Sequence, residues 1–166
     1  VLKGRVNDIG PQSIAVPATL KGLEAMHRAH GKLPWSEVVA PAIRWASEGY
    51  FVRPGMHAFW IDEPAYGRAS NLDRLHYCEE SRALYCREDG RPKAIGTPLT
   101  NPGFANVLTQ IAREGIAPFY EGDLARKMID HLQSLGALLT MEDLRECQVK
   151  RAKPKRPVSV KKRQQP

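Results

Sequence analysis

The feature that most constrains this sequence is a series of apolar stripes at helical spacing, each closed by a glycine. Apolar residues that recur every three or four positions form one face of an amphipathic helix, and glycine is favoured just beyond its last turn. The spacing predicts helices over residues 18–30, 102–114 and 122–135, which end at Gly31, Gly115 and Gly136. The chain is therefore expected to be mainly helical.

Two further helices are expected, one interrupted and one short. Residues 36–48 carry an apolar stripe, but Pro41 removes a backbone donor in its middle, so we expect two helical pieces that meet near Pro41. Thr140, followed three residues later by Asp143, resembles a capping box and predicts a helix through Leu144.

Strand signals are few. Residues 83–86, the turn signal at 88–90 and residues 92–95 predict a small hairpin, whereas residues 61–80 show no clear period. The segment at 158–160, Val-Ser-Val, could form a strand only with a partner, which can lie outside this chain. The predicted fold class is α+β, mainly helical with short strands.

The excess positive charge is confined to the end of the chain. Of the 25 basic residues that give a net charge of +7, seven lie in residues 151–166, and the other 18 balance the 18 acidic residues. We therefore expect one domain over residues 1–150 and a basic, Pro-containing tail over 151–166, either disordered or an orphan strand. The tail has no aromatic residue for base stacking, which disfavours nucleic acid as a partner. The longest apolar run is too short to span a membrane.

The cysteines and nearby histidines offer weak candidates for a metal site. His76, Cys78 and Cys86 form a loose cluster, but zinc sites use four ligands at tighter spacing, so we interpret these residues as part of a hairpin or loop. A Cys78–Cys86 bridge stays open as an alternative, and Cys147 would remain unpaired. His27 and His30 lie three positions apart without a third ligand and are expected on a helix surface. No metal and no cofactor are expected.

Other side chains that could carry chemistry have structural explanations. The isolated glycines fit helix ends rather than a phosphate loop. The carboxylates include no pair that can be placed across a cleft; those considered are Glu37, Glu48, Asp62 and Glu63. The three tryptophans are expected to fill core space; they are Trp35, Trp45 and Trp60.

Two long stretches resemble the large subunit of γ-glutamyltranspeptidases. Residues 10–52 contain a Val-Pro turn, a helix, the step Lys-Leu-Pro-Trp at 32–35 and the pattern A-P-A-I-x-x-A-x-x-G-Y at 40–50. Residues 99–144 are similar to the family's segment L-x-x-P-x-x-A through F-Y-x-G-x-L-A and its continuation L-T-x-x-D-L. Together they cover most of residues 10–144, with many family positions in order at family spacing.

This resemblance implies an internal part of a larger enzyme. Family members are precursors that cleave themselves, exposing a threonine nucleophile at the start of a small subunit, and both subunits build an αββα sandwich. None of the five threonines, at 19, 97, 100, 109 and 140, matches that processing site, and Arg5 does not map onto the family's substrate-binding arginine. We therefore assign no catalytic, substrate-binding or metal residue, and whether the chain is an enzyme stays open.

The function implied by the resemblance is hydrolysis or transfer of γ-glutamyl groups, as from glutathione, in a complete enzyme that includes the small subunit. The subfamily, transpeptidase or acylase, stays open, as does localisation, periplasmic, secreted or cytoplasmic, because no signal peptide is visible. The alternative is a stand-alone interaction module that binds nucleic acid or an acidic partner through its basic tail. The chain departs from the family pattern at Ala18 in place of glycine, at Lys21 where a small residue is usual, at Gly136-Ala137 and at 161–164.

Overall fold

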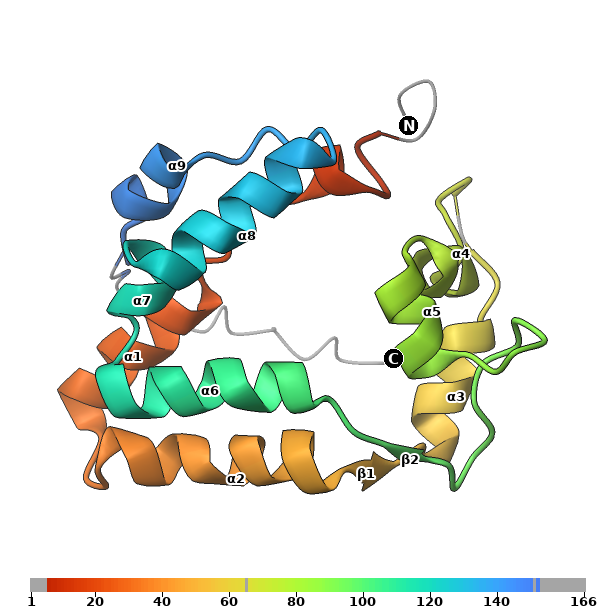
Figure 1. Ribbon diagram of the computed structural model, residues 1–166, viewed down its shortest axis with the longest axis horizontal. Coiled ribbons are helices and arrows are strands. Elements are labelled where there is room, and N and C mark those ends of the chain that lie inside the picture. Colours follow the sequence, from red (N-terminus) through yellow and green to blue (C-terminus); the bar gives the residue numbers. More distant parts are fainter. Residues whose placement is uncertain (1–5, 65, 151, 153–166) are drawn as a thin grey trace, which may run out of the picture.

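The computed structural model of the protein describes residues 6–64, 66–150 and 152. Its elements, in chain order, are η2 (Pro11–Ser13), α1 (Thr19–His30), α2 (Trp35–Glu48), β1 (Tyr50–Phe51), α3 (Pro54–Ile61), α4 (Asn71–His76), α5 (Glu79–Tyr85), β2 (Pro98–Leu99), α6 (Pro102–Glu114), α7 (Ala117–Tyr120), α8 (Asp123–Ser134) and α9 (Met141–Glu146). The helices lie along three sides of an open frame (Figure 1). The expectation of a mainly helical chain with short strands is confirmed.

The base of the frame is the pair α2 and α6, which pack side by side (Figure 1). Just beyond α2, β1 pairs antiparallel with β2, and Tyr50 is opposite Leu99. The turn between α2 and β1 needs glycine, because Gly49 has φ +95° and an added Cβ would lie 2.8 Å from the Leu99 carbonyl oxygen. The strand pair therefore fixes how α2 and α6 are aligned.

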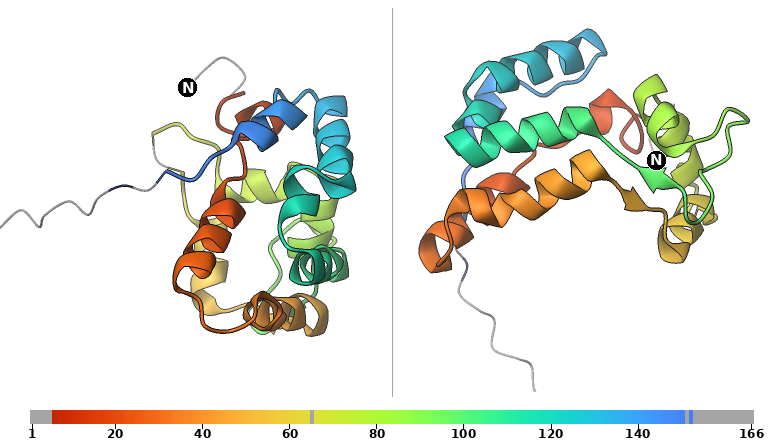
Figure 2. Two further views of the ribbon diagram at one scale, coloured as in Figure 1. Left: turned by 90° about the vertical axis from the view of Figure 1, so that its left-hand side faces the viewer. Right: turned by 60° about the horizontal axis from the view of Figure 1, so that its bottom comes forward.

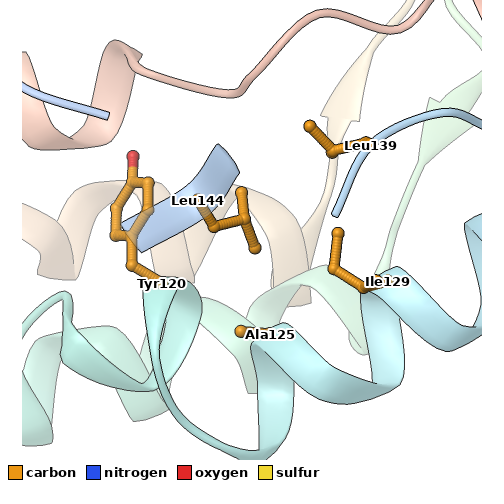
Figure 3. Packing of buried hydrophobic residues seen from close by; sticks show 5 residues of the cluster. All are labelled: Tyr120, Ala125, Ile129, Leu139 and Leu144. Carbon is orange, nitrogen blue, oxygen red and sulfur yellow. The ribbon is translucent and has the colours of Figure 1, made fainter. Parts of the chain in front are cut away.

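One side of the frame holds the larger core cluster, where α1, α7, α8 and α9 meet. Its buried residues converge from α7, α8, α9 and the segment before α9 (Figure 3); they are Tyr120, Ala125, Ile129, Leu139 and Leu144. A second cluster joins α3, α4 and α5 to the strands, with Val52, Trp60 and Leu99 at its centre. The right-hand view of Figure 2 shows the base of the frame connecting these two sides.

The predicted helix ends are largely confirmed. The side chain of Asn101 accepts the Phe104 N–H at the start of α6, and Gly115 ends that helix with φ +79°. The capping box at the start of α9 is present in both directions between Thr140 and Asp143. These signals are local, which is why the sequence alone reveals them.

Pro41 does not divide α2 into two pieces, so that prediction is wrong. The helix is continuous from Trp35 to Glu48, and it buries Val39 and Ala46 on either side of the proline. Two separate pieces of about seven residues would each be marginal as helices. Packing of one long face against α6 therefore outweighs the single backbone hydrogen bond lost at Pro41.

The predicted hairpin over residues 83–95 is wrong in its first half. Residues 83–85 end helix α5, and only an isolated bridge joins Cys86 to Pro92. The turn itself is present, since the Arg87 N–H donates to the Arg91 carbonyl at 2.8 Å. Helix α4 was missed in the segment without a period. The predicted strand at 158–160 and the tail over 151–166 lie outside the described residues, apart from residue 152.

Candidate functional site

A pocket of about 460 Å³ opens between the N-terminal segment, the start of α5 and the end of α8. Its walls are largely apolar, with Ile9 and Ile14 facing Leu132 and Leu135. Its polar lining side chains come from the N-terminal segment, α4, α5, α8 and the turn between α4 and α5; they are Ser13, Arg74, Tyr77, Cys78, Glu80 and His131. The pocket thus brings the neighbouring Cys78 thiol and Glu80 carboxylate together with the imidazole of His131 from α8.

Glu80 is the group in this pocket whose pKa its neighbours shift. The pKa of Glu80 is lowered by its own backbone N–H, by a hydrogen bond from the Cys78 side chain and by the charge of His131. The Cys78 thiol and the His131 imidazole therefore both act on the Glu80 carboxylate in this pocket. Cys78 and Cys86 are both free thiols in the structure, so the open disulfide alternative is not formed.

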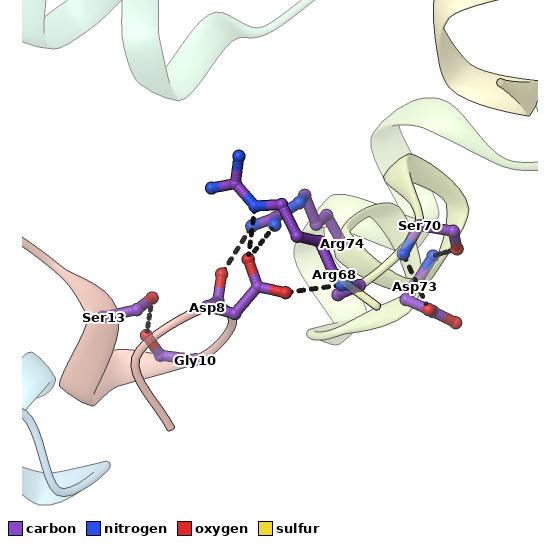
Figure 4. A network of polar contacts seen from close by, with 8 residues as sticks. Asp8, Gly10, Ser13, Arg68, Ser70, Asp73 and Arg74 are labelled. Atoms are coloured by element: carbon purple, nitrogen blue, oxygen red, sulfur yellow. Dashed lines mark hydrogen bonds and ion pairs between the residues drawn. The ribbon is translucent and has the colours of Figure 1, made fainter. Parts of the chain in front are cut away.

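The buried carboxylate of Asp8 forms ion pairs with two partly exposed arginines beside this pocket (Figure 4). The Asp8 carboxylate accepts the Ala69 N–H at 2.5 Å and an Arg74 guanidinium N–H at 2.6 Å, and Arg68 lies 3.5 Å away. Arg74 also donates to the Asp8 carbonyl at 2.6 Å. The Ala69 N–H, followed by Arg74, lowers the pKa of Asp8. These contacts, here called the Asp8 clasp, tie the N-terminal segment to α4.

Lys21 forms a second long-range polar cluster at the opposite side of the frame. Its ammonium group donates to the carbonyls of Leu144 at 2.9 Å and Cys147 at 2.8 Å, and it lies 4.4 Å from the centre of the Tyr120 ring. The Tyr120 hydroxyl in turn donates to the Pro17 carbonyl at 2.6 Å. Lys21, which departs from the family pattern, therefore caps the C-terminal end of α9.

An apolar groove of about 440 Å³ separates α1 from the α2–α6 pair. Its lining residues are mostly aliphatic and come from all three helices; they include Leu20, Leu23, Met26, Val38, Ala42 and Leu108. Its polar lining is confined to His27, His30 and the indole N–H of Trp35, which donates to the Ile111 carbonyl at 3.1 Å. This surface is here called the α1–α2–α6 groove.

The histidines on α1 have different environments. His30 is exposed, as expected for a helix-surface residue, but His27 is half-buried at the corner between α1 and α2. Its Nε2 lies 2.9 Å from the Leu33 carbonyl, and its ring packs edge-on against Trp35 at 5.2 Å. His27 is thus a partly buried residue on the surface of α1, where the chain turns back beside it at Gly31.

The three tryptophans also differ in how deeply they are buried. Trp60 belongs to the second core cluster and is buried, as expected, and Trp35 is half-buried. Trp45 is 53% exposed, so its prediction as core is wrong. It lies on the face of α2 turned away from the described residues that bury Val39 and Ala46.

The loose cluster predicted around His76 has a structural role. His76 Nε2 lies 2.6 Å from the Gly90 carbonyl, which supports its interpretation as a loop residue. Cys86 is buried, and burial raises the pKa of its thiol. Within the described residues, no group of three or more His, Cys, Asp or Glu side chains could hold a metal ion.

The hydroxyl and carboxylate groups considered as catalytic candidates also have local structural roles. The Thr109 hydroxyl donates to the Ala105 carbonyl at 2.8 Å, and the Thr140 hydroxyl bonds to Asp143. Asp62 and Glu63 are sequence neighbours on one wall of a surface hollow rather than a facing pair. Arg5 lies outside the described residues.

Sequence reasoning missed the Asp8 clasp and the capping role of Lys21. A lone aspartate or lysine gives no local pattern, and the partners are 66 positions away for Asp8 and 123 for Lys21. Helix α4 did have a signal, because Ser70 and Asp73 have capping-box spacing and form one. No helix in the described part of the chain is long and apolar enough to cross a membrane.

Solved structures share this arrangement. The chain superposes on the γ-glutamyltranspeptidase of Helicobacter pylori with a TM-score of 0.77 and 24% identity, covering 88% of this chain and 40% of that one. It superposes on the γ-glutamyltranspeptidase of Pseudomonas nitroreducens, solved with L-DON, with a TM-score of 0.69 and 27% identity, covering 88% and 39%. The fold is therefore that of part of a γ-glutamyltranspeptidase.

Sequence comparison agrees. Glutathione hydrolase of Aspergillus flavus is 33% identical over 144 residues, which cover 87% of this chain and 24% of the relative. Human glutathione hydrolase 5 proenzyme is 33% identical over 142 residues, covering 84% and 22%. The chain thus spans about a quarter of the length of these relatives. The family model for γ-glutamyltranspeptidase matches residues 2–165, and the chain belongs to the γ-glutamyltranspeptidase family.

Proposed function

We propose that this chain acts as a scaffold segment of the large subunit in a γ-glutamyltranspeptidase-type amidohydrolase. The complete enzyme would hydrolyse γ-glutamyl amides such as glutathione, or transfer their γ-glutamyl group. The observation that carries the proposal is the family match over residues 2–165, joined to a fold shared with γ-glutamyltranspeptidase structures.

The contacts of the polar residues favour a structural role for this chain over a catalytic one. The carboxylate of Asp8, the ammonium of Lys21 and the hydroxyl of Thr140 all bond to backbone groups or helix caps. Each of these hydrogen bonds either links two segments of the fold or caps the end of a helix. We therefore propose that this chain supplies no catalytic residue, and that the nucleophile belongs to a small subunit formed from the same precursor.

A turnover assay tests this proposal directly. The purified chain, incubated with a γ-glutamyl anilide, is expected to release no product above the rate of buffer alone. A chimera in which this chain replaces the 144 matched residues of the Aspergillus flavus glutathione hydrolase is expected to regain turnover.

Two results of these assays would count against parts of the proposal. Turnover by the isolated chain that disappears when one of its own residues, such as Cys78, is changed to alanine would overturn the scaffold role. A folded chimera without turnover counts against the γ-glutamyl activity.

We also propose that residues 1–150 form the folded domain and that residues 151–166 form a basic tail, which the family match includes through residue 165. Support comes from the charge distribution, since seven of the 25 basic residues lie in the tail. Deleting 151–166 is expected to leave the urea midpoint of the remaining chain unchanged. A large loss of stability on deletion would show that the tail belongs to the domain.

A further inference from the structure

The pocket beside the Asp8 clasp is built by three segments that are far apart in the sequence. Its lining comes from residues 9–14, from residues 74–80 at the junction of α4 and α5, and from residues 131–135 at the end of α8. Its volume of about 460 Å³ lies within the range of small-molecule sites, which is about 300–1,000 Å³. A small molecule bound here would contact all three segments at once.

The N-terminal wall of this pocket is held in place by contacts of its own. The Asp8 clasp anchors the segment just before the pocket, and the Ser13 hydroxyl donates to the Gly10 carbonyl at 2.7 Å (Figure 4). Gly10 lies so close to Tyr77 that an added Cβ would be 2.5 Å from the Tyr77 hydroxyl oxygen. The wall is therefore already formed before any ligand binds, as is usual for small-molecule sites.

Of the described residues that line the pocket, Glu80 alone has an acidic side chain. Hydrogen bonds from its own backbone N–H and from the Cys78 side chain lower the pKa of Glu80, so the group is a carboxylate at neutral pH. The two oxygens of a carboxylate offer about four acceptor positions, more than these two contacts use. Glu80 can therefore accept a further hydrogen bond from a ligand.

The positive charge in the lining is already paired. Arg74 donates to the Asp8 carboxylate and to the Asp8 carbonyl, both at 2.6 Å. The charge of His131 acts on Glu80. An anionic ligand would meet the Glu80 carboxylate without a free cationic partner, and like charges repel at short range. The pocket therefore favours a cation over an anion.

The apolar walls decide what kind of cation fits. They consist of isoleucine side chains from the N-terminal segment and leucine side chains from α8, against which a bare ion would lose its hydration without compensation. Within the described residues, no group of side chains could hold a metal ion. An organic ammonium ion can place an apolar body against these walls and its charged head at Glu80. The aromatic ring of Tyr77 adds to the attraction for such a head.

We propose that this pocket binds a small organic ammonium ion, whose apolar body packs between Ile14 and Leu135 and whose charged head bonds to the Glu80 carboxylate. The ligand class is an amine with an aliphatic or aromatic body and no carboxylate of its own. This inference goes beyond the proposed function, because it gives the scaffold segment a ligand site that requires no turnover.

The Cys78 thiol provides a footprint inside the pocket. Cys78 is exposed, whereas Cys86 is buried and Cys147 is half-buried, so iodoacetamide should alkylate Cys78 first. The full chain is assayed at pH 8, where an ordinary imidazole is uncharged and an alkylammonium ion keeps its charge. Millimolar 2-phenylethylammonium is expected to slow alkylation of Cys78 at least about fivefold in mass spectrometry, because occupancy protects by mass action. The rate at Cys147 should not change.

An uncharged analogue and a matched pair of variants test the role of the charge. 2-Phenylethanol has nearly the same apolar body, and its affinity is expected to be about tenfold lower because it lacks the charge-assisted hydrogen bond. Glu80→Gln should reduce the affinity for the ammonium ion to that for the alcohol. Glu79→Gln, at an exposed carboxylate that does not line the pocket, should leave it unchanged. Rates are compared with and without ligand within each variant, because Glu80 also contacts Cys78.

A second pair of variants tests the apolar wall. Leu135→Asn is expected to weaken binding of 2-phenylethylammonium and 2-phenylethanol by a similar factor, because both place the same body against this wall. Leu138→Asn, at a more exposed leucine outside the pocket lining, should weaken neither.

Three results would overturn the proposal. They are no protection of Cys78 by millimolar 2-phenylethylammonium, equal affinities for the ammonium ion and the alcohol, and equal effects of Glu79→Gln and Glu80→Gln. The first two use the parent chain, so they decide the matter even where circular dichroism shows that a variant is unfolded.

The chimera with the Aspergillus flavus glutathione hydrolase places the pocket within a complete enzyme. Protection of Cys78 by the ammonium ion is expected to persist there, and its loss would assign the pocket to neighbouring polypeptide and overturn the proposal. A chimera that turns over a γ-glutamyl anilide but leaves Cys78 unprotected counts against this inference alone. Protection without turnover supports the ammonium site and counts against the γ-glutamyl activity alone.

Discussion

Lys21 carries out a structural task that its position on α1 does not reveal. Its ammonium group donates to the carbonyls at the end of α9, where the last turn of a helix has unsatisfied acceptors and partial negative charge. The face of the Tyr120 ring adds a cation–π contact. One side chain thereby connects α1, α7 and α9.

Replacing Lys21 with methionine should expose the value of this cap. The variant keeps the aliphatic stem but leaves the carbonyls of Leu144 and Cys147 without their charged donor. We expect a loss of about 1–2 kcal/mol in the free energy of unfolding, measured by urea denaturation. Lys127→Met, at an exposed site, should change it by less than about 0.5 kcal/mol. Equal effects of the two substitutions would contradict the capping role.

Asp8 makes stability depend on pH in a defined direction. Its pKa in the folded protein is lowered, so the stabilisation is complete above the ordinary carboxyl pKa of about 3.9. It is lost as the pH falls through the lower folded value. We expect Asp8→Asn to lower the urea midpoint at pH 7 and to flatten its decline below about pH 4.

An exposed carboxylate provides the comparison for Asp8. Asp130→Asn, on the outer face of α8, should leave the acid dependence of the urea midpoint as in the parent chain. An Asp8→Asn protein whose midpoint falls with acid as steeply as the parent would refute the clasp.

At the level of single elements, α2 shows that packing decides whether a proline breaks a helix. Pro41 lies well inside α2, where the Glu37 carbonyl loses its usual backbone donor. The helix persists because Val39 and Ala46, on either side, are both buried. Propensity alone predicted two pieces, and tertiary contacts outweighed it.

Pro41→Ala tests that explanation. Alanine restores the donor and has the highest helix propensity, so the free energy of unfolding is expected to rise by about 1–3 kcal/mol in a urea titration. Ala42→Pro, one position on, should fail to give this gain. A destabilised Pro41→Ala protein would mean that the local geometry at the proline is itself needed.

The capping boxes make a smaller and more local contribution. In α9, the Thr140 hydroxyl accepts the Asp143 N–H, and in α4 Ser70 does the same for Asp73. Thr140→Ala should cost about 1 kcal/mol in thermal or urea unfolding, and Thr140→Ser much less. An equal loss for both substitutions would show that the methyl group, rather than the hydroxyl, carries the effect.

At the level of the whole molecule, the balance of apolar burial is unusual. In the described part of the chain, fifteen apolar residues are buried and seventeen large ones are exposed. Eight of the buried ones form two clusters at opposite sides of the frame, five in the larger and three in the smaller (Figure 1). This division agrees with a scaffold that offers further faces to other polypeptide.

Alanine substitutions should distinguish the two kinds of apolar residue. Leu144 is fully buried in the larger cluster, so Leu144→Ala is expected to cost about 2–5 kcal/mol in urea unfolding. Leu23 has the same side chain but is about half exposed in the groove, so Leu23→Ala should cost much less, about 1 kcal/mol or below, in the isolated chain. Comparable losses at both positions would show that the groove is already filled.

The sequence by itself determined where most helices begin and end, since caps, glycine stops and apolar periods act within a few residues. Asn101, Thr140 and Gly136 were identified for that reason, and the family motifs are built from such signals. It also indicated that α1 has a face meant for burial, without indicating what covers it.

Only the tertiary structure decided which side chains meet across the fold. The Asp8 clasp, the cap supplied by Lys21 and the half-buried corner at His27 depend on how distant segments are brought together. Asp8 and Arg74 are 66 positions apart, and Lys21 and Leu144 are 123 apart. No local pattern encodes such pairs, because their geometry is set by the packing of whole helices.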